Sequence, residues 1–243
     1  MEDDVALARR IAEQTGRLLL QVRDADDPEP VGARGDRAAQ ELIAAELAEH
    51  RPDDAVLSEE AVDGAARLGA RRVWIVDPLD GTREFAEAGR HDWAVHVALW
   101  EDGDLTAGAV ALPAVGTTLD SATVGPPPPM PDPDRVRVAV SRTRPPPVVD
   151  RLADRMAIER VALGSAGYKV SAVMLGEADA YVHAGGQHEW DSAAPVAVAR
   201  AAGLHTCRLD GSPLRYNRHD SSLPDLVVCR PELADELLGS LNA

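Results

Sequence analysis

Two aspartates three positions apart carry the most informative chemistry of the chain. Asp77 and Asp80 follow the apolar run 73–76 and precede Gly81 and Thr82. Two carboxylates about 4 Å apart repel by roughly 4 kcal/mol at an effective dielectric near 20, so a divalent cation between them would relieve the repulsion. Gly81 allows the backbone to approach a ligand closely, and a helix that opens at Thr82 would favour an anion. The segment therefore predicts a cation-assisted anion site, or else an Asx-type turn that caps a helix.

Three further acidic residues are candidates for the same site. Glu59 follows a short expected strand, 55–57, although a pair of adjacent glutamates is more often a solvated surface feature. Asp191 precedes an expected helix and could instead be its N-cap. Asp36 could likewise only cap the second expected helix. Taken one at a time, these residues leave the metal-binding and the structural interpretations open.

An apolar strand must deliver Asp77 and Asp80 to its carboxyl end, where α/β proteins commonly bind ligands. Apolar periodicity predicts helices at 4–22 and 36–49, and a hairpin with strands at 93–100 and 105–112. Beyond residue 134 strand and helix patterns alternate, which predicts an α/β second half. The expected strands there are 136–140, 161–163, 180–183 and 226–229, and the expected helices are 148–156, 170–177, 193–202 and 232–241.

A proline-rich segment separates the two halves of the chain. Prolines occupy six positions of residues 125–134, a density that cannot join a sheet and that forms a stiff connector. We therefore expect an N-terminal α+β subdomain, 1–124, that carries most of the metal ligands. The C-terminal α/β subdomain, 135–243, would carry Asp191 and the substrate contacts.

The charge balance limits the classes of partner. The 243 residues include 41 acidic and 25 basic ones, for a formal net charge of −16, which disfavours nucleic-acid polymers and anionic membranes. No apolar run reaches the roughly 18 residues of a membrane span, and the acidic N-terminus is unlike a signal peptide. Cys207 and Cys229 match neither a disulfide framework nor a zinc motif. The composition predicts a soluble, cytoplasmic protein.

The candidate residues also occur in a recognisable order. Asp36, Glu59, the run Asp-Pro-Leu-Asp-Gly-Thr at 77–82 and Trp190-Asp191 follow one another along the chain. Together they resemble the signature of the inositol monophosphatase-like family of metal-dependent phosphatases, over about residues 7–230. The sequence departs from the family pattern immediately before Asp36. The resemblance implies a layered αβαβα sandwich of mixed α+β and α/β class, of the inositol monophosphatase and sugar phosphatase type, and a homodimer.

Other segments resemble one branch of that family, the CysQ-type 3′(2′),5′-bisphosphate nucleotidases. The core threonine is followed by Arg-Glu-Phe at 83–85, where inositol phosphatases usually carry Asn-Phe. Ser141-Arg142 and 164–169, which contains the only lysine of the chain, resemble further elements of this branch. The resemblance implies Mg²⁺-dependent hydrolysis of adenosine 3′,5′-bisphosphate to AMP and phosphate. It extends to the sulfated relative of that nucleotide, to a role in sulfate assimilation and to inhibition by lithium.

The same resemblance implies a role for each site residue. Two or three Mg²⁺ ions would be held by four carboxylates and one backbone carbonyl, from Glu59, Asp77, Leu79, Asp80 and Asp191. Thr82, hydrogen-bonded to Asp36, would orient the attacking water and help to take its proton. The substrate would contact Gly81, Thr82, Ser141, Arg142, Gly164, Ser165, Lys169 and Asp191.

Three other functions remain open. An inositol monophosphatase or fructose-1,6-bisphosphatase activity would belong to the same family. The main argument against it is the Arg-Glu-Phe at 83–85. A haloacid-dehalogenase-type phosphatase would need one residue between its aspartates, whereas two residues separate Asp77 from Asp80. A non-catalytic metal- or nucleotide-binding module would bind its ligand without turnover.

Overall fold

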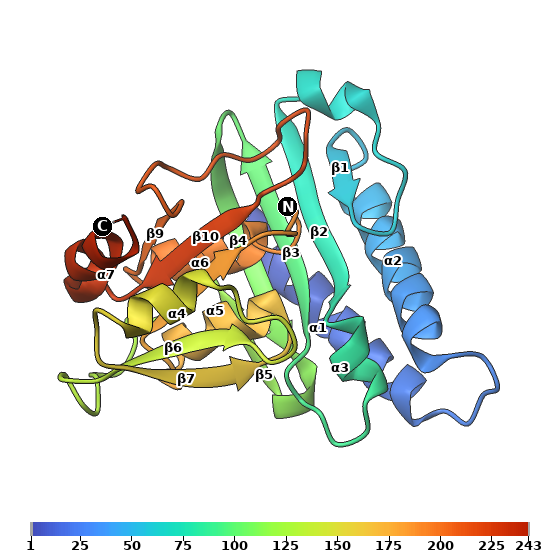
Figure 1. Ribbon diagram of the computed structural model, residues 1–243. Helices are drawn as coiled ribbons and strands as arrows, with labels where there is room; N and C mark the ends of the chain where they lie inside the picture. Colours follow the sequence, from blue (N-terminus) through green and yellow to red (C-terminus); the bar gives the residue numbers. More distant parts are fainter. Residues whose placement is uncertain (1, 243) are drawn as a thin grey trace.

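Residues 2–242, which the computed structural model describes, form two mixed five-stranded sheets (Figure 1). The first sheet has the order β1-β2-β3-β4-β5, in which only β1 and β2 are parallel. Its strands are β1 (Ala55–Ser58), β2 (Arg72–Asp80), β3 (Ala94–Glu101), β4 (Asp104–Leu112) and β5 (Thr117–Asp120). The second sheet has the order β7-β6-β8-β10-β9, with β6 parallel to both of its neighbours. Its strands are β6 (Val136–Ser141), β7 (Ile158–Leu163), β8 (Ala180–Ala184), β9 (His205–Cys207) and β10 (Asp225–Cys229).

Helices form three layers around these sheets. The helices α1 (Asp4–Asp24) and α2 (Val31–His50) cover the outer face of the first sheet. Between the sheets lie α5 (Ala166–Met174) and α6 (Ala193–Ala201), and on the outer face of the second sheet lie α4 (Val148–Ala153) and α7 (Ala234–Asn242). The expected αβαβα sandwich is therefore confirmed. No helix within residues 2–242 combines the length and the apolar character needed to cross a membrane.

Strand β2 is buried on both faces. Val73 and Ile75 pack into the core that contains α5 and α6, whereas Trp74 and Val76 pack against α1 and α2. A strand covered by helices on both sides reads as a continuous apolar run rather than as an alternating one. This packing explains why the sequence is apolar without interruption up to the first aspartate, and it fixes the strand that carries the candidate site.

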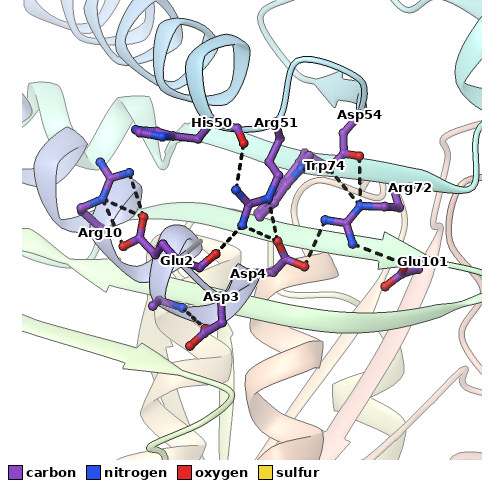
Figure 2. Close-up of polar contacts among 11 residues, drawn as sticks. Glu2, Asp3, Asp4, Arg10, His50, Arg51, Asp54, Arg72, Trp74 and Glu101 are labelled. Carbon is purple, nitrogen blue, oxygen red and sulfur yellow. Dashed lines mark hydrogen bonds and ion pairs between the residues drawn. The ribbon is translucent and has the colours of Figure 1, made fainter.

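The opposite, amino-terminal end of β2 is held by a network of ion pairs (Figure 2). The Arg72 guanidinium lies 2.9 Å from Asp54, 3.0 Å from Asp4 and 3.3 Å from Glu101. Arg51, just after α2, donates a 2.8 Å hydrogen bond from Nε to Asp4. The network thereby joins the beginning of α1, the end of α2 and the adjacent strands β2 and β3.

The second helix begins earlier than its sequence pattern predicts. Helix α2 starts at Val31, directly after Pro30, rather than at Asp36. The fixed backbone angle of proline suits the beginning of a helix, so the chain becomes helical as soon as Pro30 is passed. The interpretation of Asp36 as a helix cap is wrong, because Asp36 lies inside α2.

Several other bounds differ from those expected. Strand β5 was not predicted, because its four residues are too short to show a periodic pattern. Helix α5 begins at Ala166 instead of 170, because the side chain of Ser165 accepts a hydrogen bond from the Tyr168 N–H and caps the helix earlier. The expected helix 232–241 is divided into a 3₁₀ turn, Pro231–Leu233, and α7.

Candidate active site

The candidate site is a cavity of about 580 Å³ at the carboxyl end of β2. It is bordered by the loop after β1, by α3 (Thr82–Ala86) and by the loops that precede α5 and α6. Most of the residues singled out in the sequence line it: Glu59, Asp77, Leu79, Asp80, Gly81, Thr82, Ser141, Gly164, Ser165, Lys169 and Asp191. Segments separated by more than a hundred residues thus meet in one cavity.

A bulge in β2 places both aspartates on the same side of the sheet. Asp77 pairs with His96 and Asp80 with Ala94, so β2 advances by three residues while β3 advances by two. In a regular strand, residues three positions apart would point to opposite faces, and the extra residue of a bulge removes that difference. Pro78, which has no N–H to donate to the ladder, is compatible with this irregular position.

Gly81 then turns the chain from β2 into α3. Its φ is +89°, in the left-handed region that favours glycine. A Cβ atom at this position would lie 2.8 Å from the Cβ of Ser165. The glycine is therefore required both by the turn and by the close approach of the loop before α5.

Asp77, Asp80 and Asp191 form the centre of the site. Each offers a carboxylate oxygen, and these oxygens all lie within 4.8 Å of one another. Asp77 is 1% exposed, and its Oδ2 has no hydrogen-bond partner among residues 2–242. Asp191 accepts a 2.6 Å hydrogen bond from the His188 N–H. The N-cap interpretation of Asp191 is wrong, since Ser192 occupies that position in α6.

The pKa values reflect this crowding of negative charge. Burial, followed by repulsion from Asp80 and Glu59, raises the pKa of Asp77 well above its ordinary value. Burial and the neighbouring Asp191 raise the pKa of Glu59 to about 7. Burial and Asp80 raise the pKa of Asp191 to about 6. Ionised carboxylates are therefore disfavoured here in the absence of a cation.

Asp80 is the exception in this cluster. Burial alone would raise its pKa, but the adjacent His96 ring and the Gly167 N–H outweigh burial and hold the pKa of Asp80 below its ordinary value. The N–H groups of Ala166 and Gly167, at the start of α5, lie 3.2 and 2.6 Å from its two oxygens. Asp80 is thus ionised and held in one orientation.

The cluster fits a hard divalent cation. All its donors are carboxylate oxygens, the ligands that Mg²⁺ prefers, and the buried Oδ2 of Asp77 lacks any other partner within the described chain. Glu59 and the backbone of Leu79 lie at the same cavity. A cation would offset the repulsion that raises the pKa of Asp77, Asp191 and Glu59.

Thr82 and Asp36 form a pair next to the cluster. The Thr82 Oγ1 donor lies 3.1 Å from Asp36 Oδ1 and 3.3 Å from the Leu79 carbonyl oxygen. Burial and the nearby Glu60 raise the pKa of Asp36 to about 6. The close approach of α2 to α3 depends on Gly32, where a Cβ would lie 2.8 Å from the methyl group of Thr82.

Lys169 is almost fully buried and lines the cavity. Its Nζ donates hydrogen bonds to the carbonyl oxygens of Gly164 and Ser165, the latter at 2.9 Å, and lies 5.3 Å from the centre of the Tyr181 ring. Burial lowers the pKa of Lys169 to about 8. Lys169 therefore shapes the loop before α5 while adding positive charge to the cavity.

Two arginines near Ser141 differ in their surroundings. Arg142 is bound by Glu84 at 2.7 Å and by Glu87 at 2.6 Å, and it does not line the cavity described above. Arg144 lines the cavity, and its guanidinium has no hydrogen bond or ion pair with residues 2–242. Arg144 was not predicted from the sequence, where its only signal is its position between Ser141-Arg142 and the prolines at 145–147.

Comparison with known proteins agrees with this architecture. The model of the inositol monophosphatase family matches residues 7–242, so the chain belongs to that family. The chain is 53% identical to a 3′-phosphoadenosine 5′-phosphate phosphatase of Mycobacterium leprae, over 98% of this chain and 93% of the relative. It is 32% identical to the 3′(2′),5′-bisphosphate nucleotidase CysQ of Escherichia coli, over 88% of this chain and 94% of the relative. The fold is similar to the solved structure of an inositol monophosphatase from Zymomonas mobilis, with a TM-score of 0.79 and 25% sequence identity. The match covers 99% of this chain and 98% of that one.

Proposed function

We propose that this chain is a Mg²⁺-dependent phosphatase that removes the 3′-phosphate of 3′-phosphoadenosine 5′-phosphate, giving AMP and phosphate. The observation that carries the proposal is a cavity lined both by carboxylates and by Arg144, whose guanidinium has no partner among residues 2–242. Its volume, about 580 Å³, lies within the range of about 300–1,000 Å³ that is usual for small-ligand sites. The names of the relatives at 53% and 32% identity support the same substrate.

The metal site proposed here holds two or three Mg²⁺ ions. Its ligands are the carboxylates of Glu59, Asp77, Asp80 and Asp191 and the carbonyl oxygen of Leu79, which all come from one cavity. Mg²⁺, when bound, neutralises charge on the transferring phosphoryl group and activates water.

Thr82 and Asp36 orient that water. The Thr82 hydroxyl donates to Asp36 Oδ1, so the remaining lone pair of Oγ1 is available to accept a proton of the water. The raised pKa of Asp36, about 6, makes its carboxylate a better proton acceptor than an ordinary aspartate. The proton can therefore pass from water to Thr82 Oγ1 while the threonine proton passes to Asp36 Oδ1.

Arg144, rather than Arg142, binds the second phosphate in this proposal. Arg142 is already neutralised by two glutamates, whereas Arg144 lines the cavity. A charge-assisted hydrogen bond contributes about 1.5–3 kcal/mol, so Arg144→Ala should raise KM for the bisphosphate by roughly 10–100-fold. The control substrate is adenosine 3′-monophosphate, which lacks the 5′-phosphate and whose KM should not change. A larger effect from Arg142→Ala than from Arg144→Ala would contradict the assignment.

The test of the function is phosphate release from a panel of substrates in the presence of Mg²⁺, with and without lithium. The panel contains 3′-phosphoadenosine 5′-phosphate, its sulfated relative, inositol 1-phosphate, fructose 1,6-bisphosphate and AMP. Preference for the first two, lost with lithium, is the expected result and is consistent with a role in sulfate assimilation. Preference for a sugar or inositol phosphate would overturn the substrate assignment but not the assignment of the metal site. Binding of nucleotide without any release would indicate a non-catalytic module.

A further inference from the structure

His96 is a fully buried side chain at the edge of the acidic cluster, and the proposed reaction gives it no role. It lies on β3, directly opposite Asp77 in the bulged ladder. Its Nε2 is 3.2 Å from Asp80 Oδ2. Its Nδ1 is 3.1 Å from the carbonyl oxygen of Trp190, the residue before Asp191.

Both nitrogens of the ring therefore face acceptors. A carbonyl oxygen can only accept, so Nδ1 donates its proton to Trp190. Nε2 lies at ion-pair distance from Asp80 but makes no hydrogen bond within residues 2–242. His96 thus anchors the backbone that carries Asp191 and packs against the oxygen of Asp80 that Gly167 also contacts.

The surrounding packing leaves the ring little freedom. A Cβ at Gly167 would lie 1.9 Å from His96 Nε2, so the start of α5 touches the ring directly. The Gly167 N–H donates a 2.6 Å hydrogen bond to the same oxygen of Asp80 that faces His96. The ring therefore lies where the end of β2, the start of α5 and the loop before α6 meet.

We propose that His96 is a positioning residue for the metal-binding carboxylates: it holds Asp80 in one orientation and keeps Asp191 at the distance that a shared cation requires. The inference rests on the proposed metal-dependent function and adds a residue to it. Groups that orient metal ligands commonly change metal affinity by about 10–100-fold when they are removed. We therefore expect His96 to affect metal affinity and not nucleotide affinity.

Three substitutions separate the two contacts of the ring. His96→Leu removes both contacts and replaces the ring with an apolar side chain of similar size. The amide of His96→Gln can reach the position of Nε2 and donate to Asp80, and the shorter amide of His96→Asn can reach the position of Nδ1 and donate to the Trp190 carbonyl. His205→Leu is the matched control, because His205 lies on β9, outside the cavity lining.

The primary measurement is binding of Mn²⁺ alone, without substrate, followed by the electron paramagnetic resonance signal of the free ion. His96→Leu should weaken Mn²⁺ binding by roughly 10–100-fold, His96→Gln should restore most of it, and His205→Leu should bind as the unmodified protein does. At saturating Mg²⁺ the KM for nucleotide should be unchanged in every variant. Unaltered Mn²⁺ affinity in His96→Leu, or no recovery in His96→Gln when both variants are folded by circular dichroism, would overturn the proposal.

The same measurement distinguishes failure of this inference from failure of the proposed function. If the unmodified protein binds Mn²⁺ and His96→Leu does not, the positioning role stands even if no phosphate ester on the panel is hydrolysed. If the unmodified protein hydrolyses the nucleotide and all His96 variants keep their Mn²⁺ affinity, only the positioning role fails.

Discussion

Strand β2 has a cluster of carboxylates at each end. At the amino-terminal end arginines balance their negative charge, whereas at the carboxyl end little positive charge lies near them. Arg72 and Arg51 lie among Asp4, Asp54 and Glu101, and every one of these carboxylates faces a guanidinium (Figure 2). At the other end three aspartates place oxygens within 4.8 Å of one another, and the buried basic side chains of His96 and Lys169 lie beside Asp80.

The difference lies in what completes each cluster. The first network is satisfied by the protein itself: hydrogen bonding to Asp54 is the largest of the effects that raise the pKa of Arg72. The second leaves a buried oxygen of Asp77 without a partner among residues 2–242, and burial with like charge raises the pKa of that residue. Acidic residues therefore stabilise the fold at one end of the strand and prepare a cation site at the other.

The largest effect is expected from Asp77→Asn. Phosphate release should fall by at least about 1,000-fold, because charge stabilisation by the bound cation contributes several kcal/mol to the transition state. The free energy of unfolding in EDTA should be unchanged or higher, since an amide removes repulsion from Asp80 and Glu59. Steady-state kinetics and urea unfolding measure the two quantities.

Asp80→Asn is the matched comparison for that variant. It should also be inactive, but it should lower stability, because the Asp80 carboxylate is paired with His96 and accepts from Gly167. Equal stability of the two variants in EDTA would remove the distinction between them, and substantial phosphate release from Asp77→Asn would contradict its role as a metal ligand.

The second effect is the pH dependence of stability in the absence of metal. Acids with a raised pKa in the folded state bind more protons than in the unfolded state, so stability falls as pH rises from the unfolded to the folded pKa. The pKa of Asp191, about 6, places this loss between about pH 4 and 6. In EDTA the Tm should fall by roughly 5 °C over that window, corresponding to about 2 kcal/mol.

Saturating Mg²⁺ provides the control for this pH effect. A cation that binds the folded state favours the ionised carboxylates, so it should largely abolish the decline in Tm. Thermal unfolding monitored by circular dichroism from pH 4.5 to 8 in the two buffers tests the effect. Identical pH profiles with and without Mg²⁺ would show that the cluster does not exchange protons for metal.

The segments that carry the carboxylates follow from apolar periodicity, which is a local property, whereas the layered fold was expected from the resemblance of the ordered motifs to a known family. The bulge that turns Asp77 and Asp80 to one side depends on pairing with β3, which no local pattern specifies. The pairing of Arg142 with Glu84 joins residues 58 positions apart, so its removal from the cavity could not be predicted. His96 is one of seven histidines, and nothing in the local sequence distinguishes it. Its role depends on contacts with the end of β2, the start of α5 and the loop before α6.

A smaller loss of stability is expected when the ion-pair network at the amino-terminal end of β2 is disrupted. Arg72→Ala leaves the partly buried Asp54, Asp4 and Glu101 without their shared cation, and loss of hydrogen bonds to charged groups costs about 1.5–3 kcal/mol. Urea unfolding should show a loss of about 2 kcal/mol, with kcat per folded molecule unchanged. A fall in kcat with little change in stability would mean that the two ends of β2 are coupled.

The smallest effect is expected at the neighbouring position. Arg71 also pairs with carboxylates, Glu101 at 3.2 Å and Asp102 at 3.0 Å, but its side chain is 72% exposed, against 24% for Arg72. Exposed ion pairs contribute about 0–1 kcal/mol and are weakened by salt, so Arg71→Ala should cost less than about 0.5 kcal/mol and nothing measurable in high salt. The two variants remove the same residue type from adjacent positions that share Glu101. If Arg71→Ala were as destabilising as Arg72→Ala, charge balance alone, without burial, would stabilise this end of the strand.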